Sequence, residues 1–154
     1  MINKENLFYY IQKRENDLIK NFLKNDPDIK DTEGRTALIN AVLYNNLELF
    51  NWLIKNNANL NLQDNNGYTA LHFACQIGNL ELVKILLKNN ISINMLDKDG
   101  NTAVWVAIMN WNAGKNFDIL KELYENKADL EIINKAGNNA LKIIPKEIIE
   151  KLKK

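Results

Sequence analysis

One eight-residue phrase occurs four times along the chain, and its spacing restricts what the chain can fold into. The copies are Asp31-Thr-Glu-Gly-Arg-Thr-Ala-Leu38, Asp64-Asn-Asn-Gly-Tyr-Thr-Ala-Leu71, Asp97-Lys-Asp-Gly-Asn-Thr-Ala-Val104 and Asn134-Lys-Ala-Gly-Asn-Asn-Ala-Leu141. Their glycines are separated by 33, 33 and 37 residues, so one interval contains four additional residues. A period of this length, with a turn signal followed by a helix signal, is typical of a solenoid of stacked repeats.

The phrase resembles the T-P-L-H-x-A phrase of the ankyrin-repeat family. The segment Thr69–Ala74 reads T-A-L-H-F-A and departs from the family phrase only at the proline position. All four copies have alanine there, and alanine suits the first turn of a helix. The resemblance covers nearly the whole chain. It implies an all-α ankyrin-repeat solenoid, in which helix pairs are linked by tight turns or β-hairpin loops.

The repeats divide a single domain, residues 1–154, into about five units. These are an N-terminal capping repeat at 1–30, full repeats at 31–63 and 64–96, a repeat with a four-residue insertion at 97–133, and a truncated C-terminal capping repeat at 134–154. The insertion falls within residues 108–116. Either the first helix gains a turn there or the connection between the two helices lengthens.

Helix signals recur in phase with the phrase. Thr36, Thr69 and Thr102 precede predicted first helices, and Asn46 and Asn79 precede predicted second helices. Side-chain oxygens at such positions cap free amide groups. Two predicted apolar stripes are Leu18, Ile19, Phe22 and Leu23 in the N-terminal capping repeat, and Leu47, Phe50, Leu53 and Ile54 in repeat two.

Composition argues against several classes of partner. The net charge is +1, so the chain as a whole has no strong attraction for nucleic acid or anionic membranes. No apolar run reaches the length of a membrane span. Cys75 is the only cysteine and cannot form an internal disulfide, and the N-terminus does not resemble a secretion signal. We therefore expect a cytoplasmic, monomeric protein that binds neither nucleic acid nor membrane.

The residues most suited to chemistry have simpler structural interpretations. His72 is the only histidine and lies on the histidine of the family phrase, where the resemblance implies hydrogen bonds to backbone and threonine. Cys75 follows one helical turn later, but a Cys–His dyad needs a pocket and a third, orienting group. Spacings for a zinc site and a phosphate-binding loop are missing from the sequence. We expect no catalytic site, metal or cofactor.

The resemblance also implies a binding surface, because ankyrin repeats bind partners through turn tips and the exposed faces of first helices. Carried over by position, this surface comprises Glu33, Arg35, Tyr44, Asn66, Tyr68, Gln76, Ile77, Lys98, Asp99, Asn101, Met109 and Trp111. Tyr44, Tyr68 and Trp111 are expected to be accessible to solvent, and aromatic residues of this kind are enriched in binding hot spots. An alternative interpretation is that Tyr44 and Ile77 pack on each other between repeats.

The sequence therefore predicts a non-catalytic interaction module that binds a protein partner through a concave groove. Such a module could act as an inhibitor, an adaptor or a toxin-neutralising, immunity-like protein. The alternative is a secreted effector that uses the same groove on a host protein. An enzyme is not expected, since no set of nucleophile, base and orienting group is present.

Overall fold

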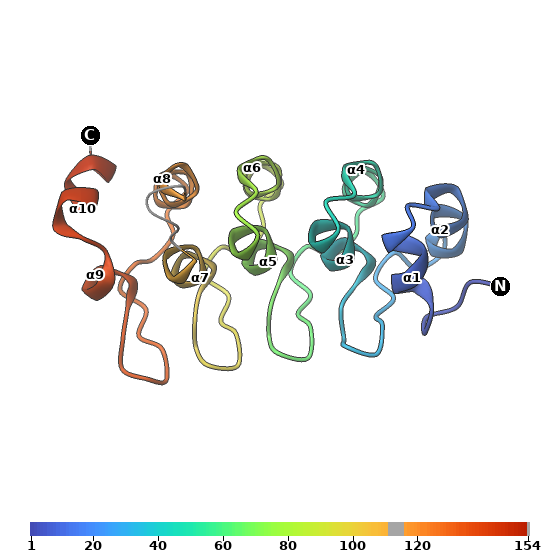
Figure 1. Ribbon diagram of the computed structural model, residues 1–154, viewed down its shortest axis with the longest axis horizontal. Coiled ribbons are helices and arrows are strands. Elements are labelled where there is room, and N and C mark those ends of the chain that lie inside the picture. Colours follow the sequence, from blue (N-terminus) through green and yellow to red (C-terminus); the bar gives the residue numbers. More distant parts are fainter. Residues whose placement is uncertain (111–115, 154) are drawn as a thin grey trace.

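The computed structural model describes residues 1–110 and 116–153, which form ten helices arranged as five antiparallel pairs in a row (Figure 1). The pairs are α1 (Leu7–Gln12) and α2 (Asn16–Leu23), α3 (Ala37–Leu43) and α4 (Leu47–Lys55), α5 (Ala70–Gln76) and α6 (Leu80–Lys88), α7 (Ala103–Met109) and α8 (Phe117–Glu125), and α9 (Ala140–Ile143) and α10 (Lys146–Leu152). In the described part of the chain no β-strand is formed, and Lys30 and Thr36 make an isolated bridge. The predicted all-α repeat architecture is confirmed.

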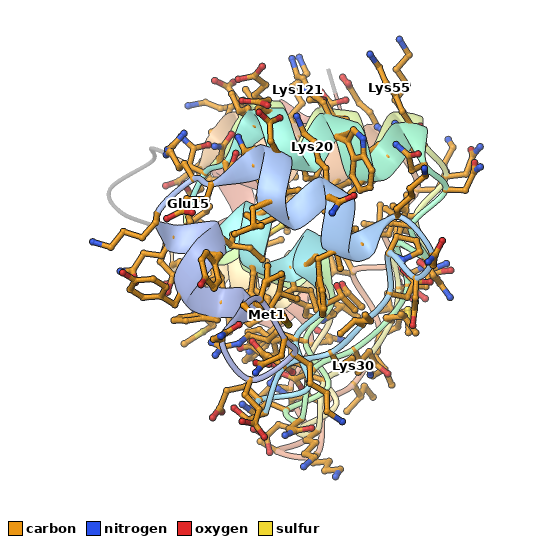
Figure 2. The ribbon with its side chains drawn as sticks, turned by 90° about the vertical axis from the view of Figure 1, so that its right-hand side faces the viewer. Met1, Glu15, Lys20, Lys30, Lys55 and Lys121 are labelled. Atoms are coloured by element: carbon orange, nitrogen blue, oxygen red, sulfur yellow. The ribbon has the colours of Figure 1, made fainter. Side chains whose placement is uncertain are left out.

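The helices form two layers, with the first helix of each pair in one layer and the second helix in the other (Figure 1). Long turn loops project from the layer of first helices. Figure 2 looks along the row from its N-terminal end. Lys20, Lys55 and Lys121 lie on the side of the second helices, and Lys30 lies toward the turn loops. The molecule therefore has an outer side made by second helices and an opposite side made by turns and first helices.

The predicted caps start the helices. The hydroxyl groups of Thr36, Thr69 and Thr102 accept the amide hydrogens of the residues three positions later, at 3.3 to 3.4 Å. The side-chain oxygens of Asn46 and Asn79 do the same for α4 and α6. These bonds satisfy amide groups that a helix leaves free at its N-terminus.

Buried apolar side chains from both layers form one continuous core. In α4 the fully buried residues are Leu49, Phe50 and Leu53, while Leu47 and Ile54 are half-buried. The predicted stripe therefore omitted the buried residue Leu49. It also assigned Leu47 and Ile54 to the buried face, although both are only half-buried. Leu18 is 40% exposed, so its predicted burial is wrong. The i, i+4 pair Ile19 and Leu23 faces the neighbouring helices, and Leu18 lies at the edge of this line.

The insertion lies between the helices and does not lengthen the first helix. α7 has seven residues, as α3 and α5 have. Residues 77–79 separate α5 from α6, whereas residues 110–116 separate α7 from α8. Asn116 is buried and donates its side-chain amide to the carbonyl oxygens of Ala107, at 3.4 Å, and Asn110, at 2.9 Å. The start of α8 is thus tied to the end of α7.

Adjacent turn loops are joined by one backbone hydrogen bond each. The amide groups of Asn65, Lys98 and Lys135 donate to carbonyl oxygens one repeat earlier, on Glu33, Asn66 and Asp99, each at 2.9 Å. The glycine in each turn has no side chain and leaves room for the next loop to approach. A Cβ atom on Gly67 would lie 2.8 Å from the amide nitrogen of Lys98, and Gly67 also has a φ of +82°. Only glycine meets both requirements without strain.

Two glycine-to-alanine substitutions separate the effect of the positive φ angle from the effect of the close approach of the next loop. We expect Gly67→Ala to lower the free energy of unfolding by about 3 kcal/mol, because it adds both a left-handed backbone strain and a steric clash. Gly137 has a φ of +77°, but a Cβ atom there would meet nothing within 4 Å. Gly137→Ala should therefore cost only about 1 kcal/mol. Urea unfolding measures both values, and equal losses would contradict the close-approach argument.

Candidate functional site

A cavity of about 380 Å³ opens between the turn loops of repeats three and four and the helix α5. The residues that line it are Asp64, Asn66, Tyr68, Phe73, Gln76, Asp97, Lys98, Asp99 and Asn101. Six of them belong to the surface predicted from the sequence: Asn66, Tyr68, Gln76, Lys98, Asp99 and Asn101. The structure thus brings half of the predicted positions around one cavity on the side of the turns.

Aromatic rings form one wall of this cavity. The half-buried ring of Tyr68 lies 5.2 Å from the ring of His72, tilted by 30°, and 5.2 Å from the ring of Phe73 in an edge-on arrangement. Partial burial raises the pKa of Tyr68, and the nearby carboxylates of Asp97, Asp64 and Asp99 raise it further. The phenol remains protonated and can donate a hydrogen bond at neutral pH.

Carboxylates of the two turn loops also line the cavity. Asp64 Oδ1 accepts the backbone amides of Asn66 and Tyr68, each at 2.8 Å. Asp97 Oδ1 accepts those of Asp99 and Asn101 at the same distance. These bonds hold the turn loops in shape and place several negative charges beside the aromatic wall.

The sequence analysis missed three lining residues: Asp64, Asp97 and Phe73. Both aspartates begin a turn phrase, and the turn uses only Oδ1 of each. Asp97 Oδ2 accepts from the side chain of Asn101, whereas Asp64 Oδ2 receives no side-chain donor among the described residues. Phe73 occupies the variable position of the T-A-L-H-x-A phrase. Repeats two and four have Asn40 and Val106 there, so variation at that position was the available signal.

The other described residues of the predicted surface do not line this cavity. Tyr44 is half-buried, as Tyr68 is, and its ring packs edge-on against Phe8 of α1 with centroids 5.1 Å apart. Arg35 is also half-buried, with its guanidinium 4.9 Å from the centroid of the same Phe8 ring. Both residues are thus engaged by the N-terminal repeat. Glu33, Ile77 and Met109 are exposed, whereas Trp111 lies outside the described residues.

His72 links repeats three and four from a buried position. Its Nδ1 accepts the amide hydrogen of Thr69 at 3.2 Å and lies 2.8 Å from the Thr69 hydroxyl oxygen. Nε2 therefore carries the proton and donates to the carbonyl oxygen of Asn101 at 3.3 Å. Burial lowers the pKa of His72, and the bond to Asn101 and the charge of Asp97 oppose this only in part. This neutral imidazole supports the turn and packs against the ring of Tyr68.

Cys75 has a packing role. Its side chain is completely buried in α5, and burial raises the pKa of the thiol far above its ordinary value. A protonated, inaccessible thiol is a poor nucleophile. In residues 1–110 and 116–153, no cluster of three or more His, Cys, Asp or Glu side chains could hold a metal ion.

The comparison with family models agrees with this architecture. The model for ankyrin repeats in three copies matches residues 7–97 and 41–134, which together extend over most of the chain. The chain belongs to the ankyrin-repeat family. Members of this family are generally protein–protein interaction modules and are typically non-catalytic. A search of curated proteins returned no match. None of the described helices is long and apolar enough to cross a membrane.

The buried histidine makes stability depend on pH. The pKa of His72 lies below its ordinary value of 6.5 in the folded state, so the unfolded chain binds the proton more readily. Neutral His72 should therefore make its full contribution to the free energy of unfolding above pH 6.5. This contribution should be lost progressively as the pH falls from 6.5 through the pKa of His72 in the folded state. Urea unfolding between pH 7.5 and 5 tests this expectation. His72→Gln should lower stability by about 1–2 kcal/mol at neutral pH and remove this pH dependence.

The reactivity of Cys75 tests whether this residue has only a packing role. We expect Cys75 in the native protein to react with a thiol reagent only during transient opening, and to react at once in denaturant. Cys75→Ala should cost about 1–2 kcal/mol of stability and leave partner binding unchanged. Rapid labelling of the native protein would show that the thiol is accessible and would contradict the packing role.

Proposed function

We propose that this chain is a cytoplasmic, monomeric and non-catalytic module that binds a protein partner in the groove between the turn loops and first helices of repeats two to four. In this role it acts as an inhibitor, an adaptor or a toxin-neutralising protein. The observation that carries the proposal is the cavity between repeats three and four, where six residues chosen by repeat position line one space.

The groove is suited to binding because it is already formed. Backbone hydrogen bonds at 2.9 Å join the successive turn loops, so their tips keep a fixed spacing. A preformed surface avoids much of the entropy cost of ordering loops during association. Tyr68 offers a large, amphipathic side chain beside the cavity, a type enriched among the residues that dominate binding energies.

Exposed apolar side chains extend the surface along the row. Ile77 is 42% exposed and Met109 is 63% exposed, and both lie at the ends of first helices. The core of the fold does not require apolar residues at such exposed positions. Contact with a partner would remove their apolar area from water and contribute to affinity.

A photo-crosslinking amino acid placed at Gln76, which lines the cavity, should join the chain to a discrete partner protein in its native lysate. The matched control places the same group at Lys88, an exposed residue of α6 on the outer side. An adduct from Gln76 but not from Lys88 is expected. An adduct from Lys88 alone, or from neither position, would contradict the proposal.

With that partner purified, Tyr68→Ala should weaken binding by about 2 kcal/mol or more, which is roughly a thirtyfold rise in the dissociation constant. Isothermal titration calorimetry measures this change. Trp52→Ala in α4, on the outer side, is the control and should leave the affinity unchanged even where it lowers the melting temperature.

A further inference from the structure

The four turn loops share one hydrogen-bond pattern, and repeat three differs from repeats two and four in what its aspartate does beyond this pattern. In each loop the first residue uses its Oδ1 atom to accept the backbone amides two and four positions later, at 2.8 to 3.1 Å. These residues are Asp31, Asp64, Asp97 and Asn134. The second carboxylate oxygen of the three aspartates is free to serve another purpose.

In repeats two and four this second oxygen is occupied by the chain itself. Asp31 Oδ2 accepts from Arg35 Nε at 3.3 Å and from Asn40 Nδ2 at 2.9 Å. Asp97 Oδ2 accepts from Asn101 Nδ2 at 3.0 Å. Each aspartate therefore has at least one side-chain donor from its own repeat.

Repeat three has aromatic residues at the equivalent positions. Tyr68 stands where repeat two has Arg35, and Phe73 stands where it has Asn40. Among the hydrogen bonds of the described residues, Asp64 Oδ2 receives no side-chain donor. Asp64 and both rings line the open cavity. Repeat three thus presents an acceptor and an aromatic wall where repeat two presents its own cation.

In repeat two, an aspartate and an aromatic ring together bind a guanidinium group. The guanidinium of Arg35 bonds Asp31 Oδ2 and also lies over the ring of Phe8, 4.9 Å from the centroid. A carboxylate together with an aromatic face is well matched to a guanidinium, which is planar, weakly hydrated and always charged. Asp64 and Tyr68 supply the same two chemical elements.

Charge and size favour the same ligand. Three carboxylates, those of Asp64, Asp97 and Asp99, line the cavity with only one cation, Lys98. Burial is the main cause of the raised pKa of Tyr68, and these three carboxylates raise it further. A volume of about 380 Å³ is at the small end for ligand pockets, so it suits one side chain of a partner.

We propose that this cavity binds an arginine side chain of the protein partner, whose guanidinium pairs with Asp64 and stacks against Tyr68. This inference rests on the proposed function and names the chemistry that the groove recognises. The other lining carboxylates strengthen attraction for the cation.

The probe is N-acetyl-arginine methylamide, titrated at low ionic strength into the isotopically labelled protein and followed by NMR. We expect saturable shifts of the amide signals of Asp64, Tyr68 and Asp99, with a dissociation constant of about 1–10 mM. The citrulline analogue has nearly the same shape without the charge and should bind at least about tenfold more weakly. The lysine analogue should also bind more weakly, because it lacks the planar fork.

Two variants test the assigned residues. Asp64→Asn should weaken binding about tenfold, since removing one charge pair costs on the order of one decade. The loop should survive, because Asn134 already makes both turn bonds in repeat five. Tyr68→Arg should abolish binding by supplying the guanidinium internally, as repeat two does. Glu81→Gln removes a charge from α6 of the same repeat and should change nothing.

Equal binding of the arginine and citrulline analogues, or of the arginine and lysine analogues, would overturn the proposal. So would unchanged binding to Asp64→Asn, or no saturable shift with the arginine analogue. If the partner still crosslinks at Gln76 in any of these cases, the groove function stands and only the guanidinium is excluded. If the probe binds but crosslinking occurs only at Lys88, the proposed function fails independently.

Discussion

The close approach of successive turn loops is the constraint on which the rest of the structure depends. The turn loops of repeats three to five each donate one backbone amide to the loop before them, at 2.9 Å, and the closest of these approaches require a residue without a side chain at the turn. Gly67 satisfies that requirement against Lys98 of the next repeat. Since the backbone bond recurs between successive loops, it fixes the spacing of the turns that lead into the first helices.

In each turn, some groups maintain the fold and others remain available for the binding surface. The backbone and one oxygen of the leading aspartate hold the loop, as Asp64 does through Oδ1. The second oxygen and the side chains directly after the glycine are not needed for that task. They can vary without loss of the turn, as Arg35, Tyr68 and Asn101 illustrate at one equivalent position. A repeat protein can thus change what it binds while its frame stays constant.

The sequence predicted the features that repeat in phase and was less accurate where the period is interrupted. The layers, the Thr and Asn caps and the role of His72 followed from the phrase. The contact between Tyr44 and Phe8 was not predicted, because Phe8 lies in a capping repeat that lacks the phrase and so has no assigned register. Leu18 was misplaced for the same reason. The insertion could not be assigned from spacing alone, since both a longer helix and a longer connection accommodate four residues.

His72 shows that fold and groove are coupled at one point. Its Nε2 donates to the carbonyl of Asn101, which lies in the next repeat and lines the cavity. Its ring packs 5.2 Å from the ring of Tyr68, so the aromatic wall contacts a group that also joins two repeats. A neutral imidazole meets both demands, because it can donate and accept at once without adding positive charge under the cavity. A cationic imidazole there would weaken the field of Asp64 and Asp97, and burial keeps the ring neutral at physiological pH. The burial that lowers the pKa of His72 therefore also preserves the negative character of the groove.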